Sequence, residues 1–184
     1  MRALIIVAAV ALCACGAPTT TTEVAAGCET TATNSWTPAG GASAYTLTAT
    51  AEGADCASAN ATFTITDAAG TAVWTETFPA NQVMFLAHVT TPAEMTEALA
   101  EWVNPNSSPF STTADLPAWP VGADAPTHDE FPFYPEEGAQ QDTYEGLRAR
   151  AVPVICYVQG MESSSCLALE NGQFNRIGLQ SFPG

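Results

Sequence analysis

Alternation of threonine with apolar residues constrains the fold of this chain more than any other feature. Residues 43–50 read Ser-Ala-Tyr-Thr-Leu-Thr-Ala-Thr, and residues 61–66 repeat the pattern as Ala-Thr-Phe-Thr-Ile-Thr. A period of two places Tyr45, Leu47 and Ala49 on one face of a half-buried strand and the threonines on the other. The sequence therefore predicts a β-sheet that buries one face and exposes the other.

Further segments complete the predicted N-terminal sheet. Residues 67–70 form a turn, because Asp bonds its own backbone and Gly tolerates positive φ, and residues 71–78 return as a partner strand. Residues 29–36 are a weaker first strand. Residues 82–89 are more continuously apolar, which favours a more buried strand and makes His88 a core histidine.

The C-terminal part also has the pattern of strands. Residues 151–158 are an apolar strand, and a five-residue turn separates them from a second strand over 164–169. Asn171-Gly172 is a two-residue hairpin signal, because both residues tolerate the positive φ that a type I′ turn requires. It leads into a last strand over 174–182.

One helix is well marked between the two β regions. Thr91 is the N-cap, Pro92 occupies the first helical position, and Glu94 stands three residues after the cap, which together make a capping box. Asn104-Pro105 ends the helix. The residues expected on its apolar face are Met95, Ala98, Leu99, Trp102 and Val103.

Residues 104–139 change character and form a Pro-rich acidic arm with seven prolines. Its aromatic residues argue against plain disorder, so we expect it to pack over the domain as an irregular arm, followed by a short helix over 141–148. The predicted fold is mainly β with one or two helices (α+β): a small antiparallel sheet or sandwich-like domain with this arm and a disulfide-stapled C-terminal hairpin.

The first residues have the pattern expected of an export signal. Arg2 precedes ten apolar residues, Ala3 to Leu12, which are too few to span a bilayer that needs about 20. Leu12-Cys13-Ala14-Cys15 follows, with Leu three residues before the last Cys and small residues between them. This stretch resembles the lipobox of bacterial lipoprotein precursors. The alternative is ordinary secretion after cleavage at Ala14.

The resemblance implies that residues 1–14 are a signal peptide and that Cys15 becomes the lipidated N-terminus. Residues 15–27 are then a small, polar tether, and residues 28–184 a single β-rich domain. Gly16 is not the Asp that would signal retention in the inner membrane. We therefore expect a protein anchored by its lipid in the bacterial cell envelope, at the outer membrane and facing the periplasm.

Four cysteines remain in the exported body, an even number in an oxidising compartment. Sequence locality favours Cys28–Cys56 and Cys156–Cys166 among the three pairings. In an up-and-down meander the start of the first strand and the end of the second lie at the same edge, which supports the first pair. The alternative is a tetrathiolate zinc site, which would want close CxxC pairs that these spacings do not supply.

The net charge of the chain limits the classes of partner that it can bind. Removal of Arg2 with the leader leaves three arginines against 19 acidic residues, a net charge of −16, and Lys is absent. Nucleic-acid binding is excluded, because it needs basic residues to displace counterions. A basic protein is a physically easier partner. The alternative is an acidic surface that serves solubility alone.

Motifs for catalysis or cofactors are missing from the sequence: there is no nucleophile elbow, zinc-protease helix, phosphate loop or dinucleotide fingerprint. His128-Asp129-Glu130 lacks calcium-loop spacing, and Ser163 to Ser165 lack a signature of a base. We therefore predict no enzyme, no cofactor and no metal site. The residues predicted as a binding surface are Trp119, Phe131, Phe133, Tyr134 and Met161.

Two functions follow from these features. The first is a non-enzymatic envelope lipoprotein, a membrane-anchored structural or binding module. The second is an acidic inhibitor or binder of a basic protein that targets the envelope, such as a lysozyme. An envelope hydrolase is the third and weakest hypothesis.

Overall fold

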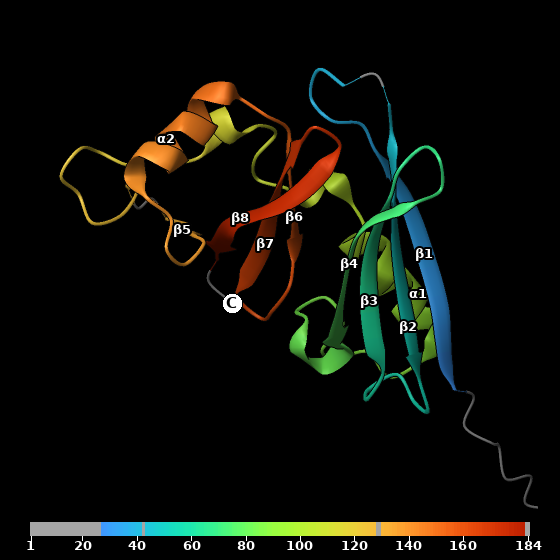
Figure 1. The fold of residues 1–184 in the computed structure, drawn as a ribbon. Helices are drawn as coiled ribbons and strands as arrows, with labels where there is room; N and C mark the ends of the chain where they lie inside the picture. Colours follow the sequence, from blue (N-terminus) through green and yellow to red (C-terminus); the bar gives the residue numbers. More distant parts are fainter. Residues whose placement is uncertain (1–26, 42, 128–129, 183–184) are drawn as a thin grey trace, which may run out of the picture.

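The computed structural model describes residues 27–41, 43–127 and 130–182. Figure 1 shows two antiparallel sheets side by side, with α1 behind the first sheet and α2 beside the second. The elements, in chain order, are β1 (Cys28–Trp36), β2 (Tyr45–Gly53), β3 (Asn60–Thr66), β4 (Ala72–Pro79), η1 (Ala80–Gln82), α1 (Pro92–Trp102), η2 (Pro105–Ser107), η3 (Thr113–Asp115), β5 (Phe133–Pro135), α2 (Gln141–Arg150), β6 (Val154–Val158), β7 (Ser163–Glu170) and β8 (Gln173–Ser181).

The first sheet is the predicted meander, with strand order β1-β2-β3-β4, and the second has order β5-β8-β7-β6. This confirms the predicted fold class. The Asn171-Gly172 turn is also confirmed, since both residues have positive φ between Glu170 and Gln173 of the β7–β8 ladder. None of the described helices is long and apolar enough to cross a membrane.

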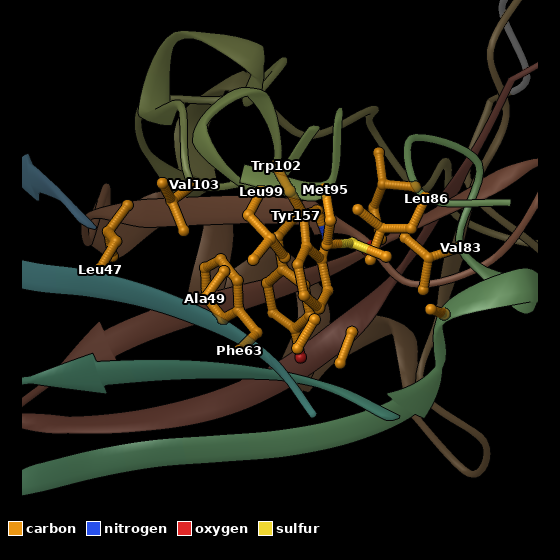
Figure 2. Close-up of a cluster of buried hydrophobic side chains, with 14 of the residues drawn as sticks. Leu47, Ala49, Phe63, Val83, Leu86, Met95, Leu99, Trp102, Val103 and Tyr157 are labelled. Atoms are coloured by element: carbon orange, nitrogen blue, oxygen red, sulfur yellow. The ribbon is translucent and has the colours of Figure 1, made fainter. Parts of the chain in front are cut away.

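Helix α1 covers one face of the first sheet and seals its core. The capping box forms as predicted, and Met95, Leu99 and Trp102 are buried while the glutamates of α1 are exposed. Figure 2 shows these side chains gathered with Phe63 and Tyr157, while Leu47 lies beside Val103. The threonines between the buried residues of β2 and β3 stay partly or fully exposed, so the alternation of the sequence is the alternation of the two faces.

The second sheet lies between two cores. Ile155, Tyr157 and Leu167 join the core of the first sheet and α1. Val154 and Cys156 face a second core, which the arm and α2 complete with Leu116, Phe133 and Tyr144. Strand β6 is consequently buried at all five positions, which explains its unbroken apolar sequence.

The arm packs over the second sheet as expected, but part of it is itself a strand. Phe133–Pro135 pairs with β8 as β5, with Pro135 opposite Gly178. A Cβ on Gly178 would lie 2.3 Å from the backbone oxygen of Tyr134, and its φ is +150°. Only glycine therefore allows β5 to approach this closely.

The predicted strand over 82–89 is wrong. The segment consists of the end of η1 and successive turns, with N–H groups of Val83, Leu86 and Val89 donating to carbonyls three residues earlier. A period of three buries Val83 and Leu86 and turns His88 outward, so the prediction of a core histidine is also wrong. A short apolar run is compatible with a strand or with helical turns, which is why periodicity misassigned it.

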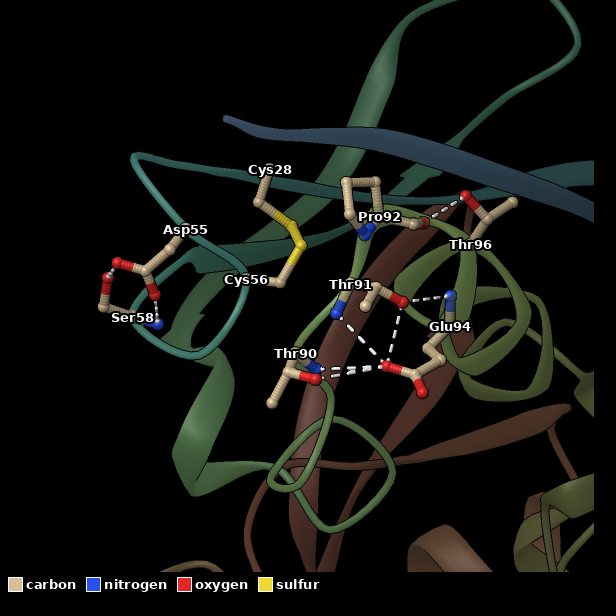
Figure 3. Close-up of a disulfide and its surroundings, with 9 residues drawn as sticks. All are labelled: Cys28, Asp55, Cys56, Ser58, Thr90, Thr91, Pro92, Glu94 and Thr96. Carbon is tan, nitrogen blue, oxygen red and sulfur yellow. Dashed lines mark hydrogen bonds between the residues drawn. A yellow bond between two sulfur atoms is a disulfide. The ribbon is translucent and has the colours of Figure 1, made fainter. Parts of the chain in front are cut away.

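Both predicted disulfides are confirmed, Cys28–Cys56 and Cys156–Cys166. Cys28 is opposite Gly53 in the β1–β2 ladder, so Cys56 in the following turn reaches it (Figure 3). The carboxylate of Asp55 accepts hydrogen bonds from the backbone and hydroxyl of Ser58, which fixes that turn. Cys156 and Cys166 are direct partners in the β6–β7 ladder, as the predicted hairpin register requires.

Candidate functional site

A group of hydrogen-bonded polar side chains joins the two sheets. The Tyr157 hydroxyl accepts from the indole N–H of Trp74 at 3.0 Å and donates to the carboxylate of Glu76 at 2.5 Å. Arg176 forms an ion pair with the same carboxylate and donates to the hydroxyl of Ser165 at 3.0 Å. Burial, and then the hydrogen bond to Glu76, raise the pKa of Tyr157 to about 12.

This polar cluster connects β4 to the second sheet. Arg176 neutralises the Glu76 carboxylate, and the raised pKa of Tyr157 keeps its phenol protonated at neutral pH, so the cluster is a stable set of contacts between the sheets. Sequence reasoning missed the cluster because Glu76 lies 81 residues before Tyr157 and 100 before Arg176. No local spacing connects such distant positions.

The five residues of the predicted binding surface lie in different environments in the structure. Phe133 is fully buried in the second core, so its assignment to a surface is wrong; pairing of β5 with β8 turns alternate residues inward. Trp119 is half-buried, packs edge-on against Tyr144 and donates its indole N–H to the backbone oxygen of Ala123. Exposed fractions of 44–50% remain for Phe131, Tyr134 and Met161.

Phe131 lines an apolar groove of about 280 Å³. The groove collects side chains from the turns after η1, from the arm, from the end of β6 and from the residue after β8. Its polar lining is limited to Ser107, Ser164 and Gln180. The residues that define the apolar groove are Met84, Phe85, Pro109, Phe131, Val158 and Phe182.

Backbone hydrogen bonds hold the walls of the apolar groove. The β6–β7 turn accepts from the N–H of Met84 through Gly160, at 3.1 Å, and from the N–H of Phe182 through Glu162, at 3.0 Å. The side-chain amide of Gln180 donates to the backbone oxygen of Phe131. The walls are therefore preformed, although no sequence pattern linked the residues after η1 to the C-terminal end.

The electrostatics around the groove are negative. Each of the three arginines that the structure describes is in an ion pair, with Glu145, Glu170 and Glu76 as partners. Among the described residues the remaining carboxylates form no ion pair. Two exposed ones flank groove residues: Glu130 precedes Phe131, and Glu162 bonds Phe182 through its backbone.

The other sequence candidates for chemistry do not assemble into a site. His88 is exposed, and Ser165 is buried under Arg176. Within the described residues no group of three or more His, Cys, Asp or Glu side chains is placed to hold a metal ion. His128, Asp129 and Cys15 lie outside the described residues.

The fold and the groove define a class, a two-sheet α+β domain with two disulfides and an apolar groove on an acidic surface. No protein-family model matches the chain, and no curated protein or solved structure is detectably similar to it. A function for this chain therefore has to be inferred from the geometry of its described residues.

Proposed function

We propose that the protein is a lipid-anchored, non-enzymatic binding module of the bacterial cell envelope, and that its apolar groove takes an apolar side chain of a basic protein. The observation that carries the proposal is a preformed groove with half-exposed Phe131, on a surface whose described arginines are all neutralised by ion pairs. A protein such as a lysozyme, which attacks the envelope, has the required charge.

The size and chemistry of the groove support a protein side chain as its occupant. A volume of about 280 Å³ lies at the small end of ligand sites, which span about 300–1,000 Å³. Anchors in protein interfaces are single large side chains in desolvated pockets, surrounded by a polar rim. Glu130 and Glu162 supply such a rim, and exposed carboxylates accelerate association with a basic partner more than they tighten it.

The envelope location rests on the lipobox and on the cysteines. Two disulfides support export, because such bonds persist in oxidising compartments. Thirteen residues from Cys15 to Gly27, fully extended, would reach about 45 Å from a membrane surface. The polar cluster between the sheets supports a structural role for its residues, because Arg176 neutralises Glu76 and burial raises the pKa of Tyr157 to about 12, which keeps the phenol protonated.

Binding is tested with the purified protein immobilised and a c-type lysozyme, then basic envelope proteins, as analytes at 0.1 and 1 M salt. The on-rate should fall markedly at high salt, since the Debye length shrinks from about 10 to about 3 Å. Phe131→Ala should weaken binding about tenfold. Val121→Ala is the matched control, because Val121 is 96% exposed on the same arm and lies outside the groove.

Neutralisation of Asp129, Glu130, Glu136 and Glu137 together should reproduce the loss of on-rate at low salt. Absence of any salt-sensitive binder that depends on Phe131 would remove the basic partner and leave a plain envelope lipoprotein. Anchoring is tested separately: Cys15→Ser should prevent acylation and move the protein from membrane to soluble fractions. Normal acylation of that variant would refute the lipoprotein assignment.

A further inference from the structure

A second cavity, with the opposite chemistry, lies between the two sheets at the far end of β1. It has a volume of about 590 Å³, roughly twice that of the apolar groove. One wall is formed by Ser35, Trp36 and Thr37, and the other by the arm over residues 105–111 together with Val154 at the start of β6. We call it the polar cleft.

No residue that lines the polar cleft, among those the structure describes, carries an ionisable side chain. This is unexpected in a chain with 19 acidic residues and a net charge of −15. A cation would find no carboxylate in the cleft, and the negative field of the whole protein repels anions. The cleft is therefore suited to an uncharged ligand.

The indole N–H of Trp36 is the strongest argument for a ligand in the polar cleft. Trp36 is only 8% exposed, yet among the described residues its indole nitrogen has no hydrogen-bond partner, and it is not among the fully buried atoms without one. The other three tryptophans, Trp74, Trp102 and Trp119, each donate their indole N–H to an oxygen of the protein. An indole is a donor only, so its acceptor here is water or an oxygen of a ligand that displaces the water.

Further polar side chains that line the cleft also have hydrogen-bonding groups without a partner in the described structure. The hydroxyls of Ser35, Thr37 and Ser111 and the carboxamide of Asn106 line the cleft and make no side-chain hydrogen bond within the described structure. Ser108 is different: its hydroxyl donates to the oxygen of Phe110 and accepts from the N–H of Cys156. Ser108 thus fixes the wall of the cleft that carries Asn106 and Ser111.

The position of Trp36 is fixed before any ligand arrives. Its ring lies 5.9 Å from the ring of Tyr45 on β2 and 5.9 Å from that of Phe174 on β8, which themselves pack edge-on at 5.3 Å. Aromatic contacts from both sheets therefore hold the indole, and a ligand does not have to order it.

We infer that the polar cleft binds a neutral saccharide. Sugar hydroxyls donate and accept at the same atom, as Ser35, Thr37 and Ser111 do, and a carbonyl or ring oxygen of the sugar accepts from Trp36. A cleft of about 590 Å³ has room for a mono- or disaccharide. This site is independent of the apolar groove and of its basic partner.

The test uses the full chain, purified in detergent and labelled with ¹⁵N, and follows its four tryptophan indole signals by NMR. The probes are glucose, cellobiose, N-acetylglucosamine and its β-1,4-linked disaccharide, against glucuronate and a neutral acetylated dipeptide amide. The signal that Trp36→Phe removes should shift with a neutral saccharide, and those of the other three tryptophans should not.

Affinity measured by calorimetry tests the individual contacts. Trp36→Phe keeps the packed ring and loses one donor, so binding should weaken about fivefold, and Asn106→Ala by a similar factor. Trp119→Phe is the control, because it removes an indole N–H that Ala123 already accepts outside the cleft. A response of Asn106→Ala keeps the test valid if Trp36→Phe does not fold.

Three results would overturn the inference. The first is the absence of a shift in the Trp36 signal with every saccharide. The second is tighter binding of the dipeptide amide than of any sugar, which would make this a peptide site. The third is equal weakening by Trp119→Phe, which would mean that the cleft is not where the sugar binds.

Discussion

The first sheet has one covered face, whereas the second is covered on both. Strands β2 and β3 alternate between buried and exposed residues, and α1 closes only their inner side. Strand β6 is buried throughout, because the first core lies on one side and the arm with α2 on the other. The one-sided sheet depends on local alternation, while the two-sided sheet depends on segments distant in the chain.

Substitutions that remove an aromatic ring from each core should have the largest effect on stability, and they test this difference between the two sheets. Phe63 stacks on Tyr157 of the second sheet at 4.2 Å, so Phe63→Ala should cost about 4 kcal/mol and loosen both sheets. Phe133→Ala should cost about 3 kcal/mol and act mainly on the arm and α2. Denaturant unfolding measures the cost, and amide hydrogen exchange locates it.

Phe63→Leu, which keeps an apolar side chain in the same core, is the control for the first variant and should cost less than Phe63→Ala. The comparison fails if Phe133→Ala raises exchange in β1 to β4 as strongly as Phe63→Ala does. The two cores would then form one cooperative unit, in spite of their separate sets of buried residues.

The same difference decides how much of the fold the sequence could predict. The meander, α1 and both disulfides were predictable, because alternation, the capping box and cysteine spacing are local signals. The inward turn of Phe133 was not, since it depends on pairing with β8, some 45 residues later in the chain. The turns over 83–89 resembled a buried strand because their apolar residues are contiguous.

The candidate sites follow the same division. Phe131 and Met161 were predictable as exposed apolar residues, since one lies on a Pro-rich arm and the other at a hairpin tip. The residues that line the apolar groove with Phe131 come from four separate segments of the chain. Trp36 is recognisable in the sequence only as the last residue of a strand. Tertiary contacts alone place these residues in cavities.

The two disulfides give the next largest effects, one in each sheet. On the chain-entropy relation, closure over separations of 28 and 10 residues is worth about 3.6 kcal/mol for Cys28–Cys56 and about 2.7 kcal/mol for Cys156–Cys166. Paired alanine substitutions, with ΔG of unfolding measured in urea, should give losses in that order. A larger loss for the second pair would mean that its place between two cores outweighs loop length.

High pH tests the polar cluster where the sheets meet. The pKa of Tyr157 is raised to about 12, mainly by burial and then by Glu76, whereas an unfolded tyrosine titrates near 10. Its contribution is therefore full below about pH 10 and is lost as pH rises to about 12, a change of roughly 2–3 kcal/mol. Unfolding free energies measured from pH 9 to 12 should show this fall.

Tyr157→Phe should flatten that pH dependence, because the substituted ring has no proton to release. Burial also raises the pKa of Tyr144 in the second core, so part of the slope should persist in the variant. An unchanged slope in Tyr157→Phe would mean that the contact between the sheets carries none of the alkaline sensitivity.

The smallest expected effect concerns α1, the helix that covers the first sheet on the side of their shared core (Figure 3). The Thr91 hydroxyl accepts from the N–H of Glu94 at 3.3 Å and donates to the Glu94 carboxylate at 2.9 Å. That donated hydrogen bond, and then those from the backbone N–H groups of Thr90 and Thr91, lower the pKa of Glu94. Thr91→Ala should cost about 1 kcal/mol. Thr96→Ala is the control, because its hydroxyl bonds only to the Pro92 carbonyl within the helix, and its loss should be near neutral.

Hydrogen exchange decides where that loss falls. If the first sheet depends on α1 alone, Thr91→Ala should raise exchange in α1 and in the strands that it contacts, β1 and β2, and leave β6 and β7 protected. The part of this cap that the Glu94 carboxylate supplies should also weaken as pH falls through its lowered pKa, because the protonated group accepts less well. Equal exchange in both sheets would show that α1 supports the second sheet as much as the first, since Trp102 donates to the backbone oxygen of Val158 at 2.6 Å.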